Sequence, residues 1–205
     1  MDSESFDLRK KVIRETAVLL YSGAEKEYKQ AKLKAAKTFG LHYMPSNLEV
    51  AMELDKIAEE NEGSNRQERL IRMRKEALRL MKILKTYDPV LVGSVWRGTI
   101  HHESDTDIIV HHSEPNDILE ALKRNDLRIR QTERVAVTKQ GKKKDSFHIH
   151  LESSAQEEVE IIVHSPEEAC LKVKCEIYGD DVIGLRVQEL ERILKEDPTQ
   201  RFVPF

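Results

Sequence analysis

The sequence predicts an α+β protein in which an N-terminal helical extension precedes a small mixed or antiparallel sheet backed by helices. Apolar residues recur every three or four positions up to about residue 87, which indicates helices, and every second position from Val90 onward, which indicates strands. Asp88-Pro89 separates the two patterns, and proline disfavours helix at the residue before it. We therefore expect a helical region at 1–87, with its last helix at about 65–86 packing on the sheet. A sheet domain at 88–169 and a C-terminal helix and tail at 170–205 should follow.

The helical region divides into segments at clear start and stop signals. An apolar stripe over residues 7–39, interrupted near residues 22–23, predicts a helix or a helix pair that Gly40 can end. Ser46–Glu49 has the Ser-x-x-Glu pattern of a capping box, and Ser64–Gln67 repeats it with glutamine. We expect a helix to begin at each. The apolar stripes of these helices form either a core or the face of a homodimer.

After Pro89 the alternating pattern predicts strands, interrupted by helices where proline or turn residues occur. The expected strands are 90–95, 107–112, 128–139, 146–153 and 159–164, the expected helices are 115–123 and 180–195, and the expected turns are 140–141 and 153–158.

Composition limits the partners and the location of the protein. The chain of 205 residues has 34 Lys and Arg against 37 Asp and Glu, for a net charge of −3, so no broad basic surface for nucleic acid or anionic lipid is expected. It has neither a leader-like N-terminus nor an apolar run near the roughly 20 residues that span a bilayer. We expect a cytoplasmic protein with no membrane partner. Its two cysteines, Cys170 and Cys175, should be free and partly buried on a helix.

The stretch LVGSVWRGTIHHESDTDIIV (91–110) breaks an apolar strand at Gly93-Ser94 and returns with Asp105 and Asp107. Because side chains alternate along a strand, both carboxylates should point to the same side, where they need a counter-ion. Carboxylate oxygens suit a hard divalent cation, and a Gly-Ser turn offers amides and a hydroxyl to phosphate oxygens. The pattern predicts a site for a metal-bound nucleoside triphosphate (NTP).

These residues also resemble a known family. Gly93-Ser94, ten further residues and then Asp105–Ile108 resemble the signature of the DNA polymerase beta-like nucleotidyltransferase superfamily, and Arg97–Thr99 resembles the fuller pattern of class I CCA-adding enzymes and minimal nucleotidyltransferases. The resemblance covers about residues 70–168. It implies a nucleotidyltransferase fold and transfer of a nucleoside monophosphate (NMP), in most relatives AMP from ATP, to a hydroxyl with release of pyrophosphate.

The resemblance also assigns roles to individual residues. It implies that Asp105 and Asp107 hold Mg²⁺ or Mn²⁺. It implies further that the NTP is held by Gly93, Ser94, Arg97 and Thr99.

The family normally adds a third carboxylate, usually aspartate, from a later strand. Glu160 in VEIIVH has the matching apolar setting, so we expect it to complete the metal site or to act as the base for the acceptor hydroxyl. Alternatively, Glu160 is only an exposed strand residue, and Glu152 is the next candidate. An antiparallel pairing of the two strands would place His150 on the side of Glu160, where it contacts phosphate or acceptor, or is simply solvated or hydrogen-bonded.

Several further features keep two interpretations each. Lys142–Lys144 either grip RNA or keep a hairpin tip soluble, and Trp96 either stacks on a base or packs. We reject zinc at the pairs His101-His102 and His111-His112, because adjacent histidines diverge and no cysteine set completes a tetrahedral site.

The sequence leaves the acceptor open, since an RNA 3′ end, a protein side chain and a small molecule all present hydroxyls. The main alternative function is a non-enzymatic partner-binding protein on the same fold, as among the antitoxin members of the minimal nucleotidyltransferases. A third is a degenerate scaffold that only binds NTP.

Overall fold

The computed structural model describes residues 3–139, 142–152 and 157–204. The turn expected at 140–141 and most of the one expected at 153–158 lie outside these residues. The helices are α1 (Ser3–Tyr21), α2 (Tyr28–Thr38), α3 (Asn47–Glu62), α4 (Ser64–Ile83), α5 (Gly93–Arg97), α6 (Pro115–Arg124) and α7 (Val187–Glu196), with 3₁₀ turns η1 (Lys85–Tyr87) and η2 (Pro166–Cys170). The strands are β1 (Val90–Val92), β2 (Thr106–His111), β3 (Ile129–Lys139), β4 (Lys142–Leu151) and β5 (Val159–His164).

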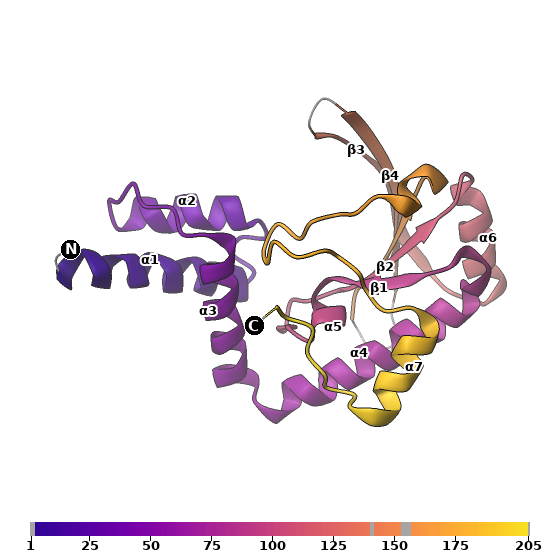
Figure 1. Cartoon of the computed structure of the whole chain (residues 1–205), viewed down its shortest axis with the longest axis horizontal. Helices are drawn as coiled ribbons and strands as arrows, with labels where there is room; N and C mark the ends of the chain where they lie inside the picture. The colour runs from indigo at the N-terminus through magenta and orange to yellow at the C-terminus, as the bar shows by residue number, and fades with distance from the viewer. Residues whose placement is uncertain (1–2, 140–141, 153–156, 205) are drawn as a thin grey trace.

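The described strands form one mixed sheet in the order β1-β2-β5-β4-β3 (Figure 1). Strands β2 and β5 are parallel, and every other neighbouring pair is antiparallel. Helices α4, α6 and α7 contribute their apolar residues to the same buried cluster as the sheet. The predicted α+β fold, a small mixed sheet backed by helices, is confirmed.

The two central parallel strands show how the sequence separates core from site. Both β2 and β5 alternate buried and half-buried residues, with Ile108 and Ile161 among the fully buried ones. Burying an aliphatic side chain of this size contributes about 1.5–3 kcal/mol to folding. The alternate positions project from the opposite face of the sheet, and there Asp107 pairs in register with Glu160. The apolar run therefore holds two carboxylates side by side.

Helices α1, α2 and α3 form apolar clusters apart from the core of the sheet, and in Figure 1 they lie to one side of it. The interrupted stripe is a helix pair, as the break near residues 22–23 predicted. Helix α3 begins with the predicted capping box, in which Ser46 and Glu49 satisfy each other's backbone amides. The buried apolar residues of α4 belong to the sheet core instead. The division of the chain at residues 87 and 169 stays a prediction.

The capping box predicted at Ser64–Gln67 is wrong. The N-cap of α4 is Gly63, and no side chain caps this helix. Gly63 has a φ of 51°, a left-handed conformation that glycine adopts without strain, so the chain reverses there and Ser64 is already helical.

Three other elements differ from the prediction by several residues at one end. Strand β4 begins at Lys142 and not at residue 146. Tertiary contacts set the other two boundaries. The first strand ends at Val92, since Gly93 has a φ of 71° and turns the chain into α5. The last helix begins at Val187, because the segment before it is extended and Leu185 exchanges backbone hydrogen bonds with Leu91, both 2.9 Å long.

The cysteines are free, as predicted, but they do not share a helix, and the predicted partial burial is wrong for Cys170. Cys170 is exposed at the end of η2, and half-buried Cys175 lies in the irregular segment that follows. None of the described helices is long and apolar enough to span a membrane. The cytoplasmic location stays a prediction.

Candidate active site

Three carboxylates meet on the face of the sheet opposite the core. Asp105 directly precedes β2, Asp107 lies within it, and Glu160 lies on the neighbouring parallel strand. One carboxylate oxygen from each residue lies within 4.8 Å of the other two. Among the described residues, these three form the group that could hold a metal ion. The predicted proximity of Glu160 to the two aspartates is confirmed. Glu152 is not in this group, and its nearest ion-pair partner is Arg128, at 3.9 Å.

The three clustered carboxylates of this triad repel one another, and a bound cation would relieve this repulsion. Burial, followed by the charges of Asp105 and Glu160, raises the pKa of Asp107 to about 8. Burial and the charge of Glu160 also raise the pKa of Asp105. Both shifts record the cost of holding like charges together away from water. Since the donors are all carboxylate oxygens, the set fits a hard divalent cation.

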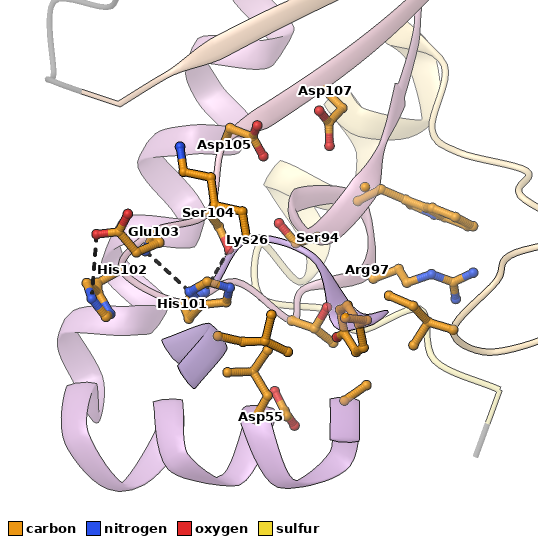
Figure 2. A pocket seen from close by; sticks show the side chains of 18 of the residues that line it. Lys26, Asp55, Ser94, Arg97, His101, His102, Glu103, Ser104, Asp105 and Asp107 are labelled. Atoms are coloured by element: carbon orange, nitrogen blue, oxygen red, sulfur yellow. Dashed lines mark hydrogen bonds and ion pairs between the residues drawn. The ribbon is translucent and has the colours of Figure 1, made fainter. Parts of the chain in front are cut away.

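Gly93 makes room for the triad. A Cβ atom at this position would lie 2.0 Å from Oδ2 of Asp107, and the φ of 71° disfavours any other residue. Ser94 follows in α5 and lines the wall of the adjacent cleft, as Figure 2 shows. Its carbonyl accepts a 3.0 Å hydrogen bond from the amide of Thr99, which also lines the cleft. All four predicted nucleotide-binding residues thus line the same cleft as the aspartates.

Arg97 also lines the cleft, but its guanidinium is bound to other parts of the chain. Its guanidinium donates to both carboxylate oxygens of Asp180, at 2.7 and 3.1 Å, and to the carbonyl of Phe202, at 2.9 Å. The rings of Trp96 and Tyr178 each lie 4.4 Å from its central carbon. Trp96 itself is buried in the core, which supports its packing interpretation. A direct contact of Arg97 with triphosphate stays a prediction that requires these bonds to open.

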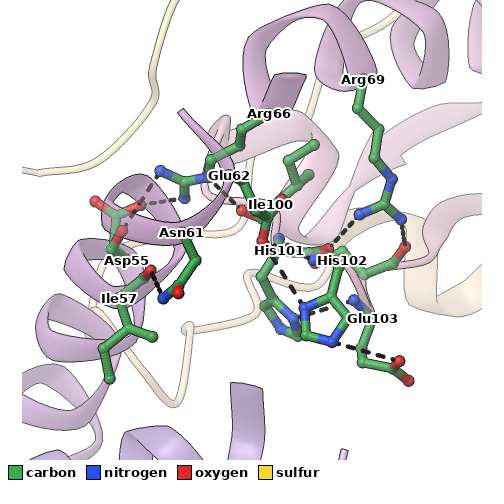
Figure 3. A network of polar contacts seen from close by, with 11 residues as sticks. Asp55, Ile57, Asn61, Glu62, Arg66, Arg69, Ile100, His101, His102 and Glu103 are labelled. Carbon is green, nitrogen blue, oxygen red and sulfur yellow. Dashed lines mark hydrogen bonds and ion pairs between the residues drawn. The ribbon is translucent and has the colours of Figure 1, made fainter. Parts of the chain in front are cut away.

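Arginines of α4, which sequence reasoning missed, hold the loop that carries Asp105 (Figure 3). Arg66 donates to the carbonyl of Ile100 at 2.6 Å, and Arg69 donates to the carbonyls of His101 at 2.5 Å and Ser104 at 2.9 Å. The loop between α5 and β2 is therefore tied to a helix of the core. The available signal was that Arg66 continues the apolar stripe of α4, where a charge needs a buried partner.

Arg74 holds α5 in place through backbone carbonyls, as Arg66 and Arg69 hold the loop before Asp105. It is fully buried and donates to the carbonyls of Val95 and Trp96 at 3.1 and 2.8 Å. It also donates to the carbonyls of Pro198 and Gln200, each at 2.8 Å. These bonds link the end of α5 to the C-terminal segment and so stabilise the turn beside Asp107.

Two histidines of β4 approach Glu160, as the predicted register requires. His148 Nδ1 lies 2.6 Å from Glu160 Oε1, and because a carboxylate only accepts, this nitrogen donates. His148 Nε2 lies 2.7 Å from the hydroxyl oxygen of Ser146. His150 is hydrogen-bonded to Glu133 at 3.2 Å and lies 3.6 Å from Glu160. His148, which received no role from the sequence, is the nearer partner of Glu160.

Both interpretations of Lys142–Lys144, contact with RNA and a soluble hairpin tip, stay predictions. The backbone of Lys142–Lys144 belongs to β4, but their side chains lie outside the part that the structure describes. His102 packs against the Tyr21 ring at 4.4 Å, and His112 pairs with Asp117 at 2.8 Å.

A cleft of about 670 Å³ opens beside the two aspartates (Figure 2). The sheet domain contributes α5, the 99–107 segment and residues 157–158 to its lining. Other lining residues come from the α1–α2 connection, from α3, and from the segment between residues 175 and 182. Segments that precede and follow the stretch from Gly93 to Asp107 therefore enclose one space together with it.

A carboxylate triad on a small mixed sheet, next to a Gly-Ser turn and a cleft, is an arrangement that could hold a divalent cation. The comparison with protein-family models is more specific. Residues 70–179 match the nucleotidyltransferase domain family, and since this is more than half of the chain, the protein belongs to that family. The predicted superfamily is thereby confirmed. No curated protein matches the chain.

Proposed function

We propose that this protein is a divalent-metal-dependent nucleotidyltransferase that moves an NMP from an NTP, with ATP as the expected donor, to a hydroxyl group. The observation that carries the proposal is the triad of Asp105, Asp107 and Glu160, with oxygens within 4.8 Å of one another inside the matched domain. A partner-binding protein has no need to hold three repelling carboxylates together, so the assembled triad favours the enzyme over that alternative.

Each residue near the triad has a role in this proposal. Asp105 and Asp107 would hold Mg²⁺ or Mn²⁺, and Glu160 would complete the site. A bound divalent cation would neutralise the charge that develops at the α-phosphate. Ser94 and Thr99 would orient the triphosphate from the cleft wall, with Gly93 leaving space for the Asp107 carboxylate.

The chemistry is a displacement at the α-phosphorus. The acceptor oxygen forms a bond to this phosphorus, the bond to the oxygen that bridges the α- and β-phosphates breaks, and pyrophosphate leaves with the electron pair. The proton of the acceptor hydroxyl passes to Glu160, whose carboxylate the hydrogen bond from His148 keeps oriented. Arg97, bound between Asp180 and Phe202, has a positioning role, since it ties α5 to the C-terminal segment.

One experiment tests the proposal and identifies the acceptor class. The purified protein is incubated with each α-labelled NTP, Mg²⁺ and cell extract, and the label is followed into RNA, protein and small molecules. Transfer into one fraction is expected, and it should disappear in the Asp105→Asn, Asp107→Asn double variant. Equal transfer by a well-folded double variant would place the chemistry elsewhere. Absence of transfer with every NTP would favour the partner-binding alternative.

A further inference from the structure

A triphosphate carries several negative charges, and the protein usually meets part of them with basic side chains. The lysine and arginine residues that line the cleft, within the described part of the chain, are Lys26, Arg69 and Arg97. Arg97 is bound to Asp180 and Phe202. Lys26 and Arg69 differ in whether their charged groups already have partners within the protein.

Arg69 is already committed to the protein. It donates to two carbonyls of the loop that carries Asp105, and its Nε lies 3.5 Å from Glu157. Moving Arg69 onto a phosphate would break the bonds that hold Asp105 in place. Neither arginine of the cleft is therefore available without rearrangement.

Lys26 is available. It lies in the connection between α1 and α2 and is exposed. Among the side chains that the structure describes, those of residues 7–136, 145–152 and 157–204, it has no hydrogen-bond or ion-pair partner. Its neighbour Glu25 pairs with Lys34 at 2.8 Å instead. Figure 2 shows the Lys26 side chain extending along the cleft toward the side on which Asp105 lies.

The connection that carries Lys26 is fixed against the active-site loop. The ring of Tyr21, at the end of α1, packs edge-on against His102 at 4.4 Å. Gly23 approaches the Glu103 carboxylate so closely that a Cβ atom there would lie 3.4 Å from it. Both contacts are to the loop that leads into Asp105, so the position of Lys26 relative to the triad is set by packing.

We propose that Lys26 binds the β- or γ-phosphate of the NTP, so that the helices α1–α3 complete the nucleotide site of the sheet domain. The inference rests on the proposed function and adds to it a residue from outside the matched domain. A charged ammonium group held over the cleft supplies the cation that Arg97 and Arg69 cannot. Because Lys26 enters the cleft from the α1–α2 connection and not from the sheet that carries the triad, it is assigned to the β- or γ-phosphate and not to the reacting α-phosphate.

The test measures binding of inorganic tripolyphosphate, ATP and AMP by calorimetry, each with Mg²⁺, to the full chain. Lys26→Gln should weaken tripolyphosphate and ATP about tenfold and leave AMP unchanged, because a charge-assisted phosphate contact is lost. Lys26→Arg should restore most of the affinity. Lys29→Gln is the matched control, an exposed lysine three residues away that does not line the cleft.

Unchanged tripolyphosphate affinity in Lys26→Gln would overturn the inference, as would an equal loss for AMP and ATP. Thermal unfolding reports on folding separately, and because Lys26 is exposed its substitution should leave the midpoint unchanged. If the wild-type protein binds neither tripolyphosphate nor any of the four NTPs, the proposed function fails and this inference fails with it. If the wild-type protein binds tripolyphosphate and the Lys26→Gln variant binds it equally well, only the inference about Lys26 fails.

Discussion

Replacing Gly93 with alanine should disable the metal site, because the new methyl group would overlap the Asp107 carboxylate. The Cβ position lies 2.0 Å from Oδ2 and 3.0 Å from Cγ of Asp107. Favourable contacts between such atoms begin at about 3.5 Å. Either the Asp107 side chain must leave its rotamer or the turn between β1 and α5 must move. Both changes separate Asp107 from Asp105 and Glu160.

The magnitude has two parts. Holding a non-glycine residue at the Gly93 φ of 71° costs about 1–2 kcal/mol. Relieving the overlap adds about 1–3 kcal/mol, the usual cost of forcing an extra methyl group into a packed site. The free energy of unfolding should therefore fall by about 2–5 kcal/mol.

Gly40→Ala provides the matched control. Gly40 has a φ of 63°, but no atom lies within 4 Å of its Cβ position, so this variant carries only the conformational cost of about 1–2 kcal/mol. Urea unfolding gives both free energies, and calorimetric titration gives the Mg²⁺ affinity. Gly93→Ala should lose Mg²⁺ binding while Gly40→Ala retains it. Wild-type Mg²⁺ affinity in Gly93→Ala, or equal destabilisation of the two variants, would refute the importance of the Gly93–Asp107 contact.

Three further predictions concern the triad and its partner. Without divalent cation, the free energy of unfolding should decrease as pH rises from about 4 to about 8, because folding raises the pKa of Asp107 and the folded state then binds more protons than the unfolded state; urea unfolding with and without Mg²⁺ measures this, and a flat metal-free profile would contradict it. Glu160→Gln should weaken Mg²⁺ binding and reduce the proton release that accompanies it near neutral pH, whereas Glu152→Gln should spare both; calorimetry in two buffers separates these effects, and identical variants would remove Glu160 from the site. His148→Ala should lower the transfer rate about tenfold with little change in NTP affinity, since Glu160 loses the hydrogen bond that orients it, and an unchanged rate in single-turnover assays would exclude this role.

Local patterns were sufficient where neighbouring residues decide the outcome. The alternation in β2 and β5 placed Asp107 and Glu160 on the polar face, because side chains on a strand must alternate. The capping box at Ser46 formed for the same kind of reason, since both of its hydrogen bonds lie within four residues. The pattern failed at Ser64, where a positive φ at Gly63 began the helix one residue early.

The residues of the site also divide into those that a local pattern predicts and those that only tertiary contacts bring together. Gly93-Ser94 and the two aspartates were visible in the sequence because their spacing is fixed by one strand, one turn and the next strand. The engagement of Arg97 was not visible, because its partner Asp180 lies 83 residues away and meets it only after the C-terminal segment folds back. The grip of Arg69 on the loop before Asp105 was hidden similarly, since Arg69 and Ser104 belong to different elements.

The sequence by itself determined the class of fold, the family and the aspartate pair, because each depends on local periodicity or on a short motif. Only the tertiary structure decided that β5 lies parallel to β2 with Glu160 in register with Asp107, and that His148 holds this glutamate. Only the tertiary structure bound the Arg97 guanidinium to Asp180 and brought Lys26 to the cleft. The physical reason is that packing brings distant segments together through many weak contacts at once, and no single local pattern encodes which segments meet.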